Sequence, residues 1–290
     1  MRTRQFGCLP KEYSDFDKAK VVILPVPFEG NNAWIKGNDK GPEAILEASC
    51  NMDVYDIASD SEVYKAGIHT ADPVKERKSH ERLVKEVETR ITLLLKKKKF
   101  PVVIGGDHSV SIGAIKAFAG YYKDKDFSVL QFDSHANLRN EFNGSPFSHE
   151  CVMARAAEMA PIIQVGIRSM SFEESEVVQP DRIFYGHNIL DGSNKTWMYD
   201  LFNKLTKNVY ITIDLSVFDP SIMASTCSPE PGGLQWYQML EMLSMVSEKT
   251  NIVGFDIVGL CPMKYNKAPE LLAAKLLYQL LTYKFAGSIK

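Results

Sequence analysis

Short apolar runs alternate with longer amphipathic segments along the whole chain, and this alternation restricts the fold more than any other feature. Seven runs are continuously apolar, as is typical of parallel strands covered on both faces. These runs are Val21–Leu24, Val102–Ile104, Val129–Phe132, Ile162–Val165, Arg182–Tyr185, Val209–Ile213 and Ile252–Ile257. Apolar residues recur at helical spacing in Ser79–Lys97, Gln235–Glu248 and Pro269–Tyr283. The pattern predicts an α/β fold built on a doubly wound parallel sheet.

No linker, repeat or change of composition divides the chain, so we expect residues 1–290 to form a single domain. The formal net charge of −2 and the pI of about 6.3 give no electrostatic basis for binding nucleic acid or an anionic membrane. No apolar run approaches the ~20 residues that span a bilayer. The N-terminal segment also lacks the apolar core of a secretory signal. These features predict a cytoplasmic protein with no nucleic-acid or membrane partner.

The cysteines are odd in number and scattered, without a C-x-x-C pair. They are Cys8, Cys50, Cys151, Cys227 and Cys261. This pattern is typical of reduced thiols and not of a disulfide framework or a zinc ribbon. We therefore expect five reduced cysteines.

Polar residues capable of chemistry follow three of the expected strands, at the edge where open α/β sheets bind ligands. One strand is followed by His108, the next by Asp133, His135 and Asn137, and a third by Asp214 and Ser216. Oxygen and imidazole ligands without thiolate suit manganese, magnesium or zinc, which can activate a water molecule. The spacing alone is equally compatible with polar residues that cap helices or satisfy one another. Neither a G-x-S-x-G elbow nor a phosphate-binding glycine loop is present.

Several segments in register over nearly the whole chain resemble the signatures of the arginase/agmatinase (ureohydrolase) family. They are VPFEGNNAWIKGNDKGPEAI at 26–45, GGDHS at 105–109, FDSHANLR at 132–139, SH at 148–149, IDLSVFDPSIMASTCSPEPGGL at 213–234 and GFDIVGLCP at 254–262. The resemblance implies a three-layer α/β/α sandwich around an eight-stranded parallel sheet. It also implies a homotrimer or homohexamer, and a pair of manganese ions whose bridging hydroxide attacks a small guanidino substrate and releases urea.

Carried over residue by residue, the resemblance assigns His108 to the first metal and His135 to the second. Asp133 and Asp214 correspond to aspartates that bridge the two ions. His149 corresponds to a histidine close to the substrate that takes part in proton transfer.

Three positions depart from the family pattern by losing an acidic group. Asn137 and Ser216 stand where the family has aspartates that bind metal, and Gly259 stands where it has a glutamate that orients the guanidinium. Two divalent ions would then face only two carboxylates, because amide and hydroxyl oxygens ligate a metal without neutralising it. We therefore expect zero or one ion of manganese or another divalent metal per site. Without the glutamate, arginine and agmatine are expected to bind poorly.

Two hypotheses follow: a ureohydrolase-like enzyme with a reduced metal site, and a catalytically inactive member of the family with a structural, binding or regulatory role. Outside the signatures, His69, His80 and His187 are expected to be surface groups, and Cys151 is not expected to be catalytic. The lysines at 96–99 are expected to form a solvated helix end and not a binding patch.

Overall fold

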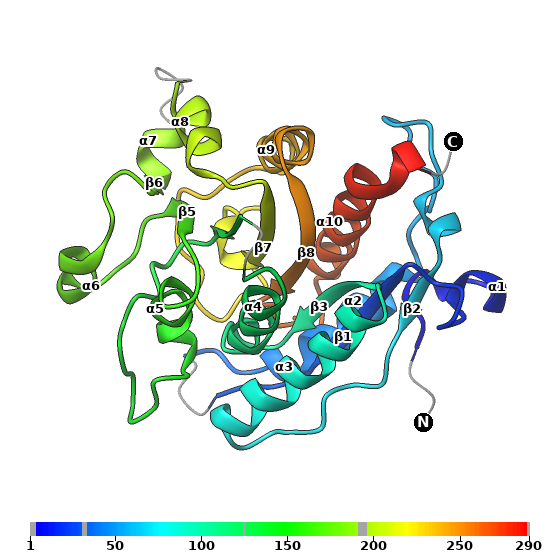
Figure 1. Ribbon diagram of the computed structural model, residues 1–290, viewed down its shortest axis with the longest axis horizontal. Helices are drawn as coiled ribbons and strands as arrows, with labels where there is room; N and C mark the ends of the chain where they lie inside the picture. Colours follow the sequence, from blue (N-terminus) through cyan, green and yellow to red (C-terminus); the bar gives the residue numbers. More distant parts are fainter. Residues whose placement is uncertain (1–3, 31–33, 124–125, 191–195, 289–290) are drawn as a thin grey trace.

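The computed structural model describes residues 4–30, 34–123, 126–190 and 196–288, and its centre is an eight-stranded sheet (Figure 1). The strands are β1 (Val21–Val26), β2 (Ile68–Thr70), β3 (Phe100–Gly105), β4 (Phe127–Phe132), β5 (Ile162–Ile167), β6 (Ile183–Tyr185), β7 (Asn208–Asp214) and β8 (Asn251–Val258). Their order across the sheet is β2-β1-β3-β8-β7-β4-β5-β6, and every pair is parallel. The seven expected strands are confirmed, and the short β2 is the strand that the sequence did not indicate.

Helices cover both faces of the sheet, which makes a three-layer α/β/α sandwich (Figure 1). The α-helices are α1 (Lys11–Ser14), α2 (Gly41–Ser49), α3 (His80–Lys96), α4 (Val110–Tyr121), α5 (Val152–Ala157), α6 (Phe172–Val177), α7 (Gly186–Leu190), α8 (Trp197–Lys204), α9 (Trp236–Lys249) and α10 (Ala268–Phe285). Apolar side chains of α2, α8, α9 and α10 pack on one face. Those of α3, α4 and α5 pack on the other face, so the strands are buried on both sides. None of the helices in the described ranges is long and apolar enough to cross a membrane.

The expectation of five reduced cysteines is wrong, because Cys8 and Cys50 form a disulfide. Cys8 ends a short 3₁₀ turn, Phe6–Cys8, and Cys50 follows the last turn of α2. The backbone N–H of Gly7 donates to Ser49 Oγ at 2.8 Å, so the two segments lie side by side. Their separation of 42 residues in the sequence concealed this proximity. Cys151, Cys227 and Cys261 are free.

His69 is likewise not a solvated surface group. It lies in the middle of β2, its Nδ1 is 2.9 Å from the carbonyl oxygen of Ser14, and its ring contacts Phe16 edge to face. The expectation for His187 agrees with the structure, since this residue is exposed and stacks on Tyr185.

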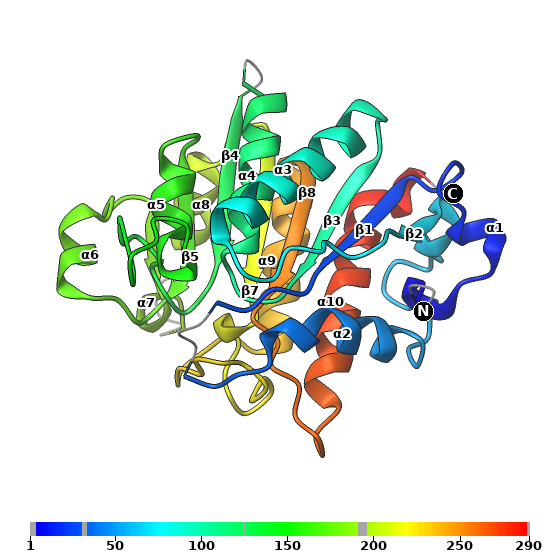
Figure 2. The same cartoon turned by 90° about the horizontal axis from the view of Figure 1, so that it is seen from below.

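The loops that carry the family signatures gather at the carboxyl ends of the central strands. Figure 2 shows the segments after β1 and β7, coloured blue and yellow, side by side at this edge. The side-chain amide of Asn38 donates to Cys227 Sγ at 2.9 Å and joins the two segments. Within the segment 26–45, residues 31–33 lie outside the described part of the chain.

Candidate active site

Asp133 is the centre of the site, and both of its carboxylate oxygens accept several hydrogen bonds from the protein. Oδ2 accepts from the side-chain amides of Gln131 and Asn137, each at 2.8 Å, and lies 3.0 Å from His108 Nδ1. Oδ1 accepts from the backbone N–H of His135 and from the hydroxyl of Ser216, each at 2.9 Å. Asp133 is completely buried. Burial alone would raise the pKa of this carboxyl, but the hydrogen bonds from His108 and His135 hold it far below its usual range.

His108 is held on its other side by a chain of buried hydrogen bonds. Its Nε2 lies 2.9 Å from Thr212 Oγ1, and the Thr212 hydroxyl donates to Asp256 Oδ1 at 2.7 Å. Tyr210 donates to the second oxygen of Asp256 at 2.7 Å. Because the Thr212 proton is used on Asp256, Nε2 of His108 is the donor in its own bond. Burial opposes the charge, but the hydrogen bond to Asp133 raises the pKa of His108 to about 9.

The local fold of the His108 loop depends on glycine. A Cβ at Gly106 would lie 1.8 Å from the carbonyl oxygen of Phe28, so a larger residue cannot occupy this position. The Asp107 carboxylate accepts hydrogen bonds from the backbone N–H groups of Gly30 and Ser109. These contacts join the loop after β1 to the loop after β3 and position His108 at the start of α4.

Asp214 differs from Asp133 because its carboxylate has fewer protein donors and faces the cavity. Oδ1 accepts the backbone N–H of Ser216 at 2.8 Å, and Oδ2 lies 3.6 Å from His108 Nδ1. Its side chain is 15% exposed. Burial and the neighbouring charge of Asp133 raise the pKa of Asp214. Gly259 lies against this carboxylate, and a Cβ there would be 2.6 Å from Asp214 Oδ1.

The two histidines on the outer side of the cavity are partly exposed. His135 Nδ1 lies 2.8 Å from Ser134 Oγ, and its Nε2 lies 3.7 Å from Glu230 Oε1. Burial alone would lower the pKa of His135, but Asp133 raises it above its usual value. His149 begins the 3₁₀ turn His149–Cys151, and its ring contacts Phe142 edge to face.

A cavity of about 50 Å³ lies above these groups. Its lining residues are Asn38, Asp107, His108, His135, Asn137, His149, Glu150, Asp214, Ser216, Thr226, Cys227 and Ser228. All of the metal, catalytic and altered positions expected from the sequence therefore border this cavity or, like Asp133 and Gly259, contact a residue that does. The volume matches a few water molecules or the head group of a small ligand.

Several residues of the site could not be recognised from sequence spacing. Cys227 lies at the cavity wall, where burial raises the pKa of its thiol to about 12. Arg168 donates to the main-chain carbonyls of Ser216 and Glu230, each at 2.8 Å, and so holds the loop after β7 in place. The position of Arg168 directly after a buried strand was the sequence signal that could have identified it.

His80 was expected on the surface, and this expectation is wrong. The residue begins α3, and its ring contacts Phe28 edge to face. Its Nε2 and Asp107 Oδ2 both lie close to Gly30, because a Cβ added at Gly30 would be 3.1 Å from each of these atoms. Burial lowers the pKa of His80.

Three of these groups could together hold a metal ion. One ligand atom from each of His108, Asp133 and Asp214 lies within 4.8 Å of the others. An imidazole nitrogen and two carboxylate oxygens form a donor set that divalent manganese, magnesium or zinc accepts. Binding would require His108 to lose its Nδ1 proton and the Asn137 amide to move away from Asp133.

Comparison with known proteins identifies the family of the chain. The sequence model of the Arginase family matches residues 19–282. The chain belongs to the arginase family. This arginase-family chain is 32% identical over 295 residues to N(1)-aminopropylagmatine ureohydrolase of Synechocystis. The match covers 96% of this chain and 95% of that protein. It is also 34% identical to the N(1)-aminopropylagmatine ureohydrolase of Thermus thermophilus, covering 93% and 92% of the two chains.

Solved structures of the family have the same fold. The agmatine ureohydrolase of Thermoplasma volcanium superposes with a TM-score of 0.87 at 25% identity, covering 100% of this chain and 98% of that chain. Proclavaminate amidino hydrolase of Streptomyces clavuligerus has a TM-score of 0.85 at 22% identity, covering 98% and 97% of the two chains. The eight-stranded sandwich expected from the resemblance is therefore confirmed.

Proposed function

We propose that this arginase-family chain binds a small guanidino or amine cation in its cavity and does not hydrolyse arginine or agmatine at rates typical of enzymes. The saturation of Asp133 supports the proposal most directly. Asn137 and Ser216 each donate a hydrogen bond to one of its two oxygens. The lone pairs that would bridge two metal ions are thus engaged by residues that stand where the family has metal-binding carboxylates.

Charge also opposes a pair of ions. Two divalent ions about 3.5 Å apart repel by roughly 19 kcal/mol at an effective dielectric of 20, before their ligands are counted. Asp133 and Asp214 supply two negative charges. Ser216, which lines the same cavity, has a neutral hydroxyl where the family has a carboxylate. At most one divalent ion is consistent with this donor set.

Asp214 is the group that would receive an organic cation. It faces the cavity and has one oxygen without a close donor, so a guanidinium or ammonium can form a charge-assisted hydrogen bond with it. The relatives are named for N(1)-aminopropylagmatine and agmatine. A guanidino compound with an amine tail is therefore the first ligand to test.

One observation favours a second candidate, a hydrolase that uses a single metal ion. His108, Asp133 and Asp214 converge closely enough to hold one ion, which would supply a polarised water molecule. In that case His149 lies at the same cavity and could accept or donate a proton.

A direct test measures metal content, ligand binding and turnover on the same preparation. Protein equilibrated with excess manganese and then dialysed should retain no more than one ion per chain by mass spectrometry of the metal. Titration calorimetry in EDTA should show weak binding of agmatine, because the chain lacks the family glutamate at Gly259. This binding should be lost in Asp214→Asn but retained in Asp200→Asn, which removes an exposed carboxylate on α8. Two retained manganese ions, or urea release from agmatine at about 10 per second, would refute the proposal.

The assembly and the location of the protein remain predictions of the family resemblance and of the sequence. We propose a homotrimer or homohexamer in the cytoplasm. Sedimentation of the purified protein and fractionation of the source cells are the respective measurements. The Cys8–Cys50 disulfide makes the second measurement important, because disulfides are uncommon in reducing compartments.

A further inference from the structure

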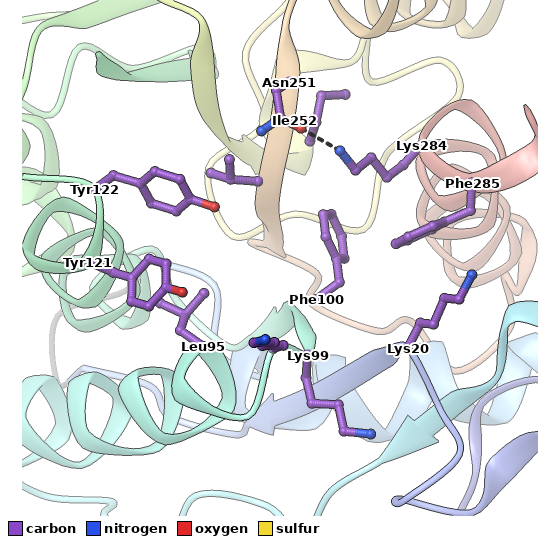
Figure 3. Close-up of a pocket in the computed structure, with 12 residues that line it drawn as sticks. Lys20, Leu95, Lys99, Phe100, Tyr121, Tyr122, Asn251, Ile252, Lys284 and Phe285 are labelled. Carbon is purple, nitrogen blue, oxygen red and sulfur yellow. Dashed lines mark hydrogen bonds between the residues drawn. The ribbon is translucent and has the colours of Figure 1, made fainter. Parts of the chain in front are cut away.

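A second cavity, of about 300 Å³, lies at the opposite end of the sheet from Asp133 (Figure 3). It is bordered by residues at the beginning of β1, β3 and β8 and at the ends of α3, α4 and α10. The strand β8 connects the two ends, with Asn251 at this cavity and Val258 near the site described above. At ~3.3 Å per residue, its eight residues separate the two regions by more than about 20 Å.

The polar residues of this cavity carry positive charge without a matching carboxylate. Four lysines line it, namely Lys20, Lys98, Lys99 and Lys284, and no aspartate or glutamate among the residues that the structure describes does so. Within the described ranges of the chain, none of these lysines forms an ion pair. The Lys99 ammonium is used structurally, since it donates to the carbonyl oxygens of Phe16 and Ala19 at 2.7 Å each. The other three lysines of the lining are Lys20, Lys98 and Lys284.

Lys284 is the most constrained of the three. Its Nζ donates to Asn251 Oδ1 at 2.6 Å and lies 6.0 Å from the centre of the Phe100 ring. The side chain is half-buried, and burial lowers the pKa of its ammonium group. Among the described residues, this half-buried ammonium has an amide oxygen as its hydrogen-bond acceptor and no carboxylate, so it gains more from an anion than a fully exposed lysine does.

Lys98 supplies an independent observation, because its backbone is left-handed with a φ of 56°. It lies just after α3, where its N–H donates to the carbonyl oxygen of Leu95 at 2.9 Å. Glycine or asparagine is the usual residue at such a position. Lys98 therefore carries the steric cost of a left-handed backbone while it lines the cavity.

The rest of the cavity is aromatic and aliphatic. Figure 3 shows the rings of Tyr121 and Tyr122 extending from α4 toward the cavity, opposite Lys284 and Phe285. Phe100 lies between them. The phenol hydroxyls add hydrogen-bonding groups at the side facing the lysines, whereas Phe100 and Phe285 offer apolar surface to a carbon skeleton.

We propose that this cavity binds a small phosphate monoester with an aromatic or aliphatic body. Three ammonium groups match the charge of about −1.5 to −2 on a phosphate monoester better than the single charge of a carboxylate, and lysine is a common phosphate ligand. The helix dipole favours positive side chains at a helix C-terminus, and this accounts for the lysines of the cavity at the ends of α3 and α10. It does not account for Lys20, which precedes β1. The site is independent of the proposed function of the cavity at Asp214.

Phenyl phosphate is a suitable probe, because it combines both features. Titration calorimetry of the full chain at low ionic strength should show one binding event, weaker for inorganic phosphate and absent for phenol. Lys284→Gln and Lys98→Gly should each weaken binding about tenfold, as expected for the loss of one charge-assisted hydrogen bond. The matched control is Lys96→Gln, which removes an exposed charge from the same helix outside the cavity.

The outcomes separate this proposal from the other one. Asp214→Asn should bind phenyl phosphate as the unmodified chain does, even if it fails to bind agmatine. Absence of phenyl phosphate binding to the unmodified chain would overturn the proposal. Equal binding by Lys98→Gly, Lys284→Gln and Lys96→Gln would overturn it as well, because the phosphate would then lie elsewhere.

Discussion

The side-chain amide of Asn137 donates a hydrogen bond to Asp133 Oδ2 at 2.8 Å, within the group of ligand atoms that could hold a metal ion. An amide proton thus takes the place beside this carboxylate that a cation could otherwise occupy. Asn137 adopts a left-handed backbone with a φ of 53°, which asparagine tolerates better than most residues. The residue is therefore suited to its position by both its backbone and its amide.

Exchanging this amide for a carboxylate should make the stability of the protein depend on metal. In Asn137→Asp, a donor to Asp133 is lost and two carboxylates approach each other, so in EDTA we expect the free energy of unfolding to fall by about 2 kcal/mol. Manganese should restore it, whereas the unmodified chain should respond weakly. Thermal melting with EDTA or manganese measures both effects. Asn140→Asp, at an exposed position three residues later, is the control and should show neither.

Adding a side chain at Gly259 should lower the stability of the protein. Its φ of 84° disfavours any residue with a Cβ, and that Cβ would lie 2.6 Å from Asp214 Oδ1. Gly232 has a similar φ of 76° with open space around it, so it isolates the backbone effect. We expect Gly232→Ala to cost about 1 kcal/mol and Gly259→Ala at least about 1 kcal/mol more, because of the contact. Equal losses in denaturant unfolding would show that Asp214 moves aside freely.

The sheet was predictable from sequence because strands buried on both faces leave continuous apolar runs. β2 escaped this reasoning because it is three residues long and has His69 at its centre. The positions of His108, Asp133 and Asp214 followed from the strand ends, where parallel topology brings distant residues together.

The groups that support the site were not predictable in the same way. Thr212 contacts His108 across 104 residues of sequence and Asp256 across 44. Thr212 and Asp256 lie within strands β7 and β8, whose sequences are mostly apolar. His80 and the Cys8–Cys50 pair show the same limit. Their partners are set by the packing of loops and helix ends, for which the sequence contains no periodic signal.

The three free thiols should be nearly unreactive in the folded protein. Burial raises the pKa of Cys151 to about 11 and that of Cys227 to about 12. At pH 8, a thiol with a pKa near 11 is ionised to about one part in a thousand, and the thiolate is the reactive form. Ellman's reagent should therefore titrate less than one thiol in the native chain and three after denaturation without reductant. Alkylation should accelerate as the pH rises above 10, and rapid reaction at pH 8 would contradict these shifts.

The disulfide should contribute substantially to stability. Closing a loop of 42 residues removes chain entropy worth about 4 kcal/mol from the unfolded state on the loop-entropy account. The double variant Cys8→Ser/Cys50→Ser should unfold at lower denaturant concentration by a corresponding amount. Dithiothreitol should lower the stability of the unmodified chain toward that of the variant and should leave the variant unchanged. A reductant effect of equal size in both proteins would place its origin elsewhere.

Lys98 allows a test in which stability and ligand binding change in opposite directions. Glycine accepts a φ of 56° without the steric cost of a side chain, so Lys98→Gly should raise the free energy of unfolding by about 1 kcal/mol. Lys85→Gly removes the same charge from an exposed position inside α3 and should lower it by about 1 kcal/mol. Denaturant unfolding of both variants gives the comparison. A lysine kept only for stability would not be improved by replacement, so a stabilised Lys98→Gly that has lost phenyl phosphate binding assigns this residue to the ligand and not to the fold.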